Sequence, residues 1–242
     1  MSPSPLATKH VLIHGFRISY GVFGTGDPIV MLHGTPSSSL IWRNVIPTLT
    51  SAGFKVHIFD LLGYGLSERP WDPSVDTSIT GQVSILERLL DHWHLETREQ
   101  MENGLEKLIN TPDTHHRLHF KNWLLSAVHN KQRFANTSLN TFLDYISGPI
   151  GQGSLFHHQV RHYDPKHTME ISDRLSELGR IPVKLIWGAD DAWQVKGWAY
   201  RLREAIPGSQ LEILQNCGHF APEDQPERVS EILVSFLQAS GM

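Results

Sequence analysis

The chain has 242 residues, of which 40% are hydrophobic and 19% are charged, and it contains a single cysteine. This composition is typical of one globular domain with a full core, and it excludes a disulfide-rich scaffold. The net charge of −4 gives no basic surface for nucleic acid or anionic lipid. No secretory h-region or membrane-length apolar run occurs, so we expect a soluble cytoplasmic protein without nucleic-acid or membrane partners.

The first hundred residues alternate strand and helix patterns, which is typical of α/β proteins. Apolar residues at helical spacing predict one helix over residues 40–49, with Ser37, Ser38 and Ser39 offering N-cap oxygens, and a second helix over residues 77–93. Short apolar runs bounded by turn residues predict strands over residues 10–14, 16–22, 29–32 and 54–59.

A helical block follows at the point where another parallel strand is expected. Residues 95–109 place Met101, Leu105 and Leu108 on one helical face. Further helices are predicted over residues 118–128, 139–146 and 155–163, and the glycine-rich stretch 148–153 separates the last two. We therefore interpret residues 98–165 as a helical cap, inserted within a single domain that spans residues 1–242.

The C-terminal part returns to alternating strands and helices. Its predicted strands, 182–187 and 211–214, lead to Asp191 and His219 respectively. An acid and a base at the ends of neighbouring strands are two members of a nucleophilic triad, so we predict both residues to be catalytic. Asp190 is adjacent and is an alternative acid. The predicted helices here cover residues 169–178, 195–205 and 226–238.

Four motifs together resemble the α/β-hydrolase superfamily, in the branch that holds epoxide hydrolases, haloalkane dehalogenases and small ester or C–C hydrolases. The similarity covers residues 10–97 and 168–240. It implies a three-layer α/β-hydrolase-type sandwich with a helical cap, and the G-x-x-D register selects Asp191 as the acid. The motifs are His33-Gly34-Thr35-Pro36, Asp60-x-x-Gly63-x-Gly65-x-Ser67, Gly188-x-x-Asp191, and Gly218-His219 followed by Pro226-Glu227.

The motif that carries the family's nucleophile is missing. No G-x-S-x-G, G-x-D-x-G or G-x-C-x-G sequence occurs in the chain. The strand before this elbow, the helix after it and the next strand are also missing, with the break near residues 95–98. A β-α-β unit takes roughly 30 or more residues. We therefore expect a central sheet shortened by two strands, which is either rejoined or left with two open edges.

Three residues of the N-terminal motifs have competing interpretations. The resemblance implies that the backbone N–H of Thr35 donates to an oxyanion, but the residue can also serve only to join a strand to a helix. His33 is interpreted as a structural hydrogen-bonding residue rather than a base. Asp60 is expected to fasten its own glycine-rich loop.

No other residue is a convincing substitute for the nucleophile. Cys217 lies two positions before His219, and we interpret it as a small buried residue. Ser147 and Ser154 flank the glycine-rich stretch but lack the strand–turn–helix context of an elbow. The catalytic site is thus predicted from its acid and base alone.

Histidines and aromatic residues of the cap were considered as ligand-binding groups. The pairs His115/His119 and His158/His162 have the i,i+4 spacing that can hold zinc, but no third ligand is indicated, so a solvated face is favoured. We expect neither a metal nor a cofactor. Aromatic residues at helical spacing are core residues or line a pocket for an apolar substrate, namely Phe120, Trp123 and Phe142.

Three functions remain open from the sequence. The first is hydrolysis of a small apolar ester, epoxide or halide-type substrate through the His–Asp pair, without an identifiable nucleophile. The second is a non-catalytic pseudo-hydrolase that binds a small ligand. The third is a nucleophile-free lyase or oxygenase that uses His219 as a general base.

Overall fold

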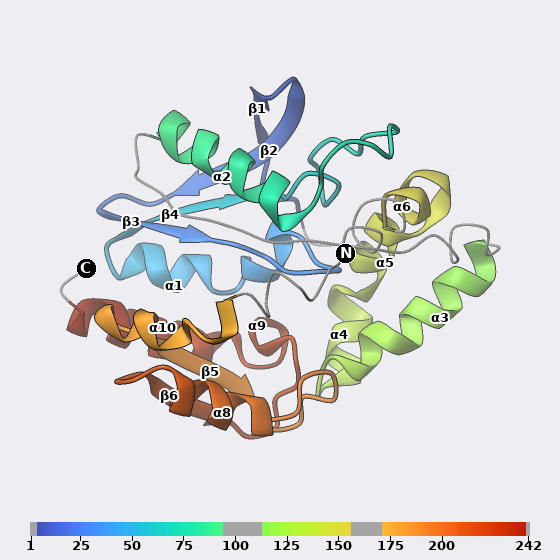
Figure 1. Ribbon diagram of the computed structural model, residues 1–242. Helices are drawn as coiled ribbons and strands as arrows, with labels where there is room; N and C mark the ends of the chain where they lie inside the picture. Colours follow the sequence, from blue (N-terminus) through green and yellow to red (C-terminus); the bar gives the residue numbers. More distant parts are fainter. Residues whose placement is uncertain (1–3, 94–112, 156–170, 241–242) are drawn as a thin grey trace.

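The computed structural model describes residues 4–93, 113–155 and 171–240. The helix predicted over residues 95–109 and nearly all of the one predicted over 155–163 lie outside these residues. The described strands form two separate sheets, with helices on and between them (Figure 1). The protein therefore has an α/β-hydrolase-type architecture with a shortened sheet.

The N-terminal sheet has four strands in the order β1-β2-β4-β3: β1 (Lys9–Ile13), β2 (Phe16–Phe23), β3 (Asp27–Met31) and β4 (Phe54–Phe59). β1 and β2 form an antiparallel hairpin, β2 lies antiparallel to β4, and β3 lies parallel to β4. His14 and Gly15 form the hairpin turn with φ values of 52° and 87°. Two positive φ values match the tight turns whose twist suits a hairpin.

The second sheet consists of two parallel strands, β5 (Lys184–Gly188) and β6 (Gln210–Leu214). Among the described strands, β3 pairs only with β4, and β5 pairs only with β6. Within the described ranges, the shortened sheet is therefore left with two open edges, one on β3 and one on β5, and is not rejoined.

Helices α1 (Ile46–Ser51) and α10 (Pro226–Ala239) pack against each other between the two sheets (Figure 1). Helix α2 (Ile79–Trp93) covers the other face of the first sheet, and α8 (Gly197–Ala205) packs on β5 and β6. One apolar cluster joins the two sheets through α1 and α10; among its members are Met31, Leu49, Val56, Leu214, Val229 and Ile232. The two sheets therefore share one buried apolar core.

The helical block contains α3 (Asp113–Ser126), α4 (Lys131–Thr137), α5 (Leu139–Ile146) and α6 (Gly148–Ser154). Its core also includes Ile41 of the N-terminal part and Phe220 of the C-terminal part. The block therefore packs against both halves of the molecule. No helix in the described ranges is both long and apolar enough to cross a membrane.

Several predicted elements differ in the structure. The helix predicted over residues 40–49 is two elements, η1 (Ser39–Trp42) and α1, because Pro47 in the first turn of α1 cannot continue a preceding helix. Residues 148–153, expected to be a separator, belong to α6, since Pro149 suits a first helical turn and packing on α5 outweighs the low propensity of glycine.

Two further elements were not predicted, and one was misplaced. Helix α4 begins after Asn130, whose side chain accepts a hydrogen bond from the Arg133 N–H, so an N-cap signal was present in the sequence. The short helix α9 (Ala221–Asp224) follows the histidine loop. The described part of residues 169–178 ends as a 3-10 helix, η3 (Leu175–Arg180).

The two halves and the helical block meet at a buried ion pair. Arg43, just after η1, donates from Nη1 and Nη2 to the Glu223 carboxylate of α9 at 2.5 and 2.9 Å. Ser138, between α4 and α5, donates to the same carboxylate at 3.0 Å. The Glu223 side chain is only 2% exposed. This junction links segments 180 positions apart in the sequence, across the place where the sheet is interrupted.

Candidate catalytic site

The acid and the base predicted from the sequence meet at the carboxyl end of the second sheet. Asp191 follows β5 and His219 follows β6, and the His219 Nδ1 lies 2.9 Å from the Asp191 Oδ2. The other carboxylate oxygen accepts the backbone N–H groups of Trp193 and Gln194 at 2.9 and 2.8 Å. The carboxylate is thereby fixed in one orientation, with one oxygen reserved for the imidazole.

Glycines allow the two loops to approach each other. A Cβ on Gly188 would lie 2.2 Å from the Gly218 carbonyl oxygen, which no side chain can tolerate. Because Gly188 has no side chain, the two loops come close enough for the Asp190 N–H to donate to the Cys217 carbonyl at 2.9 Å. Gly188 of the G-x-x-D motif is therefore required for the contact between the loops that carry Asp191 and His219. Gly218 of the G-H motif is required for the approach to the end of α3, because a Cβ there would lie 2.6 Å from the Ala127 carbonyl oxygen.

The hydrogen-bond geometry defines the state of the imidazole. An ionised carboxylate only accepts, so Nδ1 carries the proton in the His219–Asp191 bond, and in the neutral imidazole Nε2 is then the acceptor nitrogen. No described residue hydrogen-bonds the Nε2 of His219, whose side chain is 31% exposed. The imidazole is thus partly exposed, and its Nε2 has no protein partner among the described residues.

Asp190, the alternative acid, has a different partner. Its Oδ2 lies 2.7 Å from the Nδ1 of His129, and both side chains are about half exposed. Asp190 therefore points toward the connection between α3 and α4, and Asp191 is the carboxylate that contacts His219.

The α3–α4 connection is fastened to the histidine loop. Asp224 accepts the backbone N–H groups of Gly218, His129 and Asn130 at 2.8, 2.7 and 2.9 Å. The Phe220 N–H donates to the carbonyl of Ala127 at 2.9 Å. These bonds hold the end of α3 beside the Asp191–His219 pair.

Thr35, the predicted oxyanion donor, hydrogen-bonds a residue outside this pair. Its hydroxyl is 2.5 Å from the Tyr64 hydroxyl, and burial raises the pKa of Tyr64. The Thr35 N–H has no hydrogen-bond acceptor among the described residues. The structure brings Asp191 and His219 together and places no hydrogen bond between either of them and Thr35.

His33 and Asp60 have structural hydrogen bonds, in line with their interpretation from the sequence. Asp60 accepts the N–H groups of Ser39 and Leu66 at 2.7 and 2.8 Å, and so fastens the glycine-rich loop. The His33 Nε2 accepts from the Leu61 N–H at 3.1 Å. Burial lowers the pKa of His33, which keeps the imidazole neutral and suited to this acceptor role.

The residues considered as replacement nucleophiles are engaged elsewhere. Cys217 is fully buried, and that burial, with nearby carboxylates, raises its pKa to about 12, so thiolate is scarce near neutral pH. Ser147 donates to the Leu143 carbonyl at 2.5 Å, and Ser154 donates to the Gly63 carbonyl at 2.6 Å. None of the three has a hydrogen bond to His219. Of the serines at 37–39, Ser38 caps η1.

The histidine pairs gain no support as a metal site within the described ranges. No cluster of three or more metal-ligating side chains occurs there. His119 is exposed on α3, whereas His158 and His162 lie outside the described residues. Phe120 and Phe142 are buried in the core of the helical block, and Trp123 is partly buried against it.

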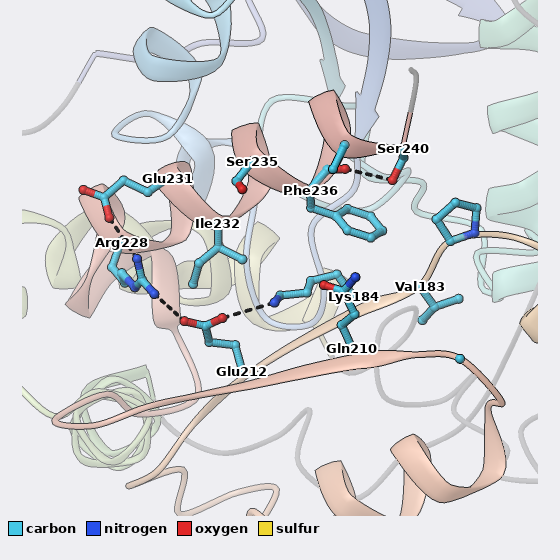
Figure 2. Close-up of a pocket in the computed structure, with 13 residues that line it drawn as sticks. Val183, Lys184, Gln210, Glu212, Arg228, Glu231, Ile232, Ser235, Phe236 and Ser240 are labelled. Carbon is cyan, nitrogen blue, oxygen red and sulfur yellow. Dashed lines mark hydrogen bonds and ion pairs between the residues drawn. The ribbon is translucent and has the colours of Figure 1, made fainter.

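A separate cavity of about 400 Å³ lies at the opposite end of the second sheet (Figure 2). The starts of β5 and β6 and one face of α10 line it. Glu212 accepts from Lys184 at 3.1 Å and from Arg228, and Arg228 also bonds Glu231 at 3.1 Å (Figure 2). These charges neutralise one another in a chain of ion pairs, and the cavity is remote from His219 because it opens at the other strand ends.

Comparison with known proteins finds similarity to the alpha/beta hydrolase fold. The family described as alpha/beta hydrolase fold matches residues 27–96. The soluble epoxide hydrolase of a Corynebacterium species is 26% identical over 291 positions, which cover 95% of the chain and 96% of that protein. An uncharacterised protein of Mycobacterium tuberculosis is 26% identical, over 98% of the chain and 83% of that protein.

Solved structures agree in fold. An alpha/beta hydrolase fold protein from Burkholderia ambifaria superposes with a TM-score of 0.79 at 22% identity, covering 95% of this chain and 97% of the other. The alignment to the epoxide hydrolase, at 291 positions, is longer than the chain of 242 residues. That relative therefore carries segments with no counterpart in this protein.

Proposed function

Because the chain belongs to the α/β-hydrolase superfamily, we propose that His219 and Asp191 form a general-base pair that hydrolyses a small apolar ester, epoxide or halide-type substrate. The observation that carries this proposal is the His219–Asp191 hydrogen bond of 2.9 Å with Nε2 free of protein partners among the described residues. The known hydrolases among its relatives, an epoxide hydrolase and a haloalkane dehalogenase, support the substrate classes.

The proposed reaction on an ester uses water in place of a side-chain nucleophile. The Nε2 of His219 removes a proton from water as the oxygen adds to the carbonyl carbon, and Asp191 stabilises the resulting imidazolium. The oxyanion receives the backbone N–H of Thr35. Collapse of the tetrahedral intermediate breaks the bond to the leaving alkoxide, which takes the proton back from Nε2. No covalent enzyme intermediate forms.

The helical block is proposed to act as a cap, and it supports an apolar substrate. Trp123 of α3 and Trp193 of the acid loop stack at 4.2 Å beside His219. These rings, together with Phe220, give the side of the base a largely apolar and aromatic surface. The free buried cysteine supports the proposal of a cytoplasmic location.

The proposal is tested with a panel of p-nitrophenyl esters and small epoxides. We expect His219→Ala to abolish turnover, and Asp191→Asn to reduce it by about 10³–10⁴ because the wrong imidazole tautomer is held. The matched control is His129→Ala, which removes a neighbouring histidine outside the pair and should retain turnover. Turnover that persists in His219→Ala would refute the general base, and an inactive, folded wild type would favour the non-catalytic alternative.

A further inference from the structure

Trp193 connects helix α3 to the proposed base. Its indole stacks on Trp123, with ring centroids 4.2 Å apart and an interplanar angle of 14°. Its Nε1 donates to the Ser126 hydroxyl at 2.8 Å. The same indole lies 5.0 Å from the His219 imidazole, centroid to centroid, at an angle of 39°. One side chain therefore contacts both the end of α3 and the imidazole.

His219 needs such a contact because a single hydrogen bond defines its orientation. With only Nδ1 bonded, to Asp191, a side chain that is 31% exposed can turn about its terminal torsion, which replaces Nδ1 by Cδ2 beside the carboxylate. That turn would break the bond to Asp191 and put Cε1 in the position of Nε2. A flat ring packed against the imidazole opposes the turn by filling the volume that it would sweep.

The side chain and the backbone of Trp193 make different contacts, so a substitution can remove the first and leave the second. The backbone N–H of Trp193 bonds the Asp191 Oδ1 at 2.9 Å whatever the side chain is. The indole is itself held from two sides, by the Trp123 ring and by the Ser126 hydroxyl, and Ser126 in turn donates to the Trp123 carbonyl at 2.6 Å. Its position is therefore set by α3 and not by the acid loop alone.

We propose that Trp193 is a positioning residue, whose indole, held by Trp123 and Ser126, keeps the His219 imidazole turned with Nδ1 on Asp191 and Nε2 free. This inference rests on the proposed function for its catalytic consequence. It also makes the orientation of the base depend on the docking of α3, so that the helical block and the base act as one unit.

Two measurements on purified protein test the role. The first is the low-field NMR resonance of the His219 Nδ1 proton, assigned by its loss in His219→Gln; the second is kcat and KM on a hydrolysed ester. We expect Trp193→Ala to lose the resonance to exchange with water and to lower kcat by about tenfold to a hundredfold, with KM nearly unchanged. Trp193→Phe keeps a ring against the imidazole and should retain the resonance.

The controls separate positioning from folding and from the proposed function. Trp198→Ala removes a half-exposed tryptophan of α8 and should change neither measurement. Ser126→Ala removes the indole tether and the local bond of Ser126 to the Trp123 carbonyl, and it leaves the Trp193 ring in place. We expect faster exchange of the Nδ1 proton in this variant, which tests the inference if Trp193→Ala does not fold. Unchanged exchange in Ser126→Ala, or an unchanged resonance in Trp193→Ala, overturns the inference. Because the resonance needs no turnover, it decides the role of Trp193 even if the wild type hydrolyses nothing.

Discussion

The buried ion pair between Arg43 and Glu223 is the contact whose loss should most weaken the union of the two halves. The Glu223 side chain is 2% exposed and the Arg43 side chain is 14% exposed, so water screens the pair poorly. In Arg43→Ala the carboxylate keeps only the Ser138 hydroxyl as a side-chain donor. Breaking a buried pair in this way costs about 3–5 kcal/mol, because one charge is left uncompensated.

The assay is urea unfolding followed by circular dichroism and tryptophan fluorescence. With a slope near 2 kcal/mol/M, we expect the midpoint for Arg43→Ala to fall by roughly 2 M. The double variant Arg43→Met/Glu223→Leu replaces both charges with apolar groups and should recover most of this loss. Arg174→Ala, which breaks an exposed ion pair with Glu177, should leave the midpoint nearly unchanged. A cost for Arg43→Ala no larger than that of Arg174→Ala would refute the reasoning.

Three further outcomes concern His57, Asp224 and Cys217. His57 is buried, both of its ring nitrogens lack a partner among the described residues, and burial lowers its pKa to about 4. As pH falls, the unfolded chain takes up the proton before the folded one does, so the free energy of unfolding should fall by about 3 kcal/mol between pH 6.5 and 4. Urea titrations of His57→Leu should lack this part of the loss. Asp224→Ala should free the α3–α4 connection to limited proteolysis near His129, whereas cleavage at the wild-type rate would contradict the role of Asp224. Cys217 should react with a thiol reagent only when the protein unfolds; rapid labelling of native protein would show that the thiol is accessible.

Local signals in the sequence predicted most of the regular elements. Apolar runs bounded by turn residues predicted the six described strands, and helical spacing predicted α2, α5, α8 and α10. The motifs also predicted that Asp191 and His219 lie together, because loops at neighbouring strand ends meet at one edge of a sheet. Whether these residues are catalytic remains a prediction.

Other features depend on contacts between distant residues, which no local pattern contains. Helix α6 forms on a glycine-rich sequence because it packs on α5, and α1 is separated from η1 by the geometry around Pro47. The sequence predicted a shortened sheet but left open whether its edges rejoin. Packing of α1 on α10 and the pair of Arg43 with Glu223 hold the two sheets as separate layers, and these contacts join parts of the chain that are far apart in sequence.

The central claim is that His219, oriented by Asp191, acts on water directly. It is tested most directly by intact-mass spectrometry of protein quenched during hydrolysis of p-nitrophenyl acetate, with nitrophenol release followed in the same sample. We predict continued release with the protein mass unchanged, and no release above background in His219→Ala. An acetylated protein that accumulates and decays with turnover, or release that persists without His219, would contradict the account.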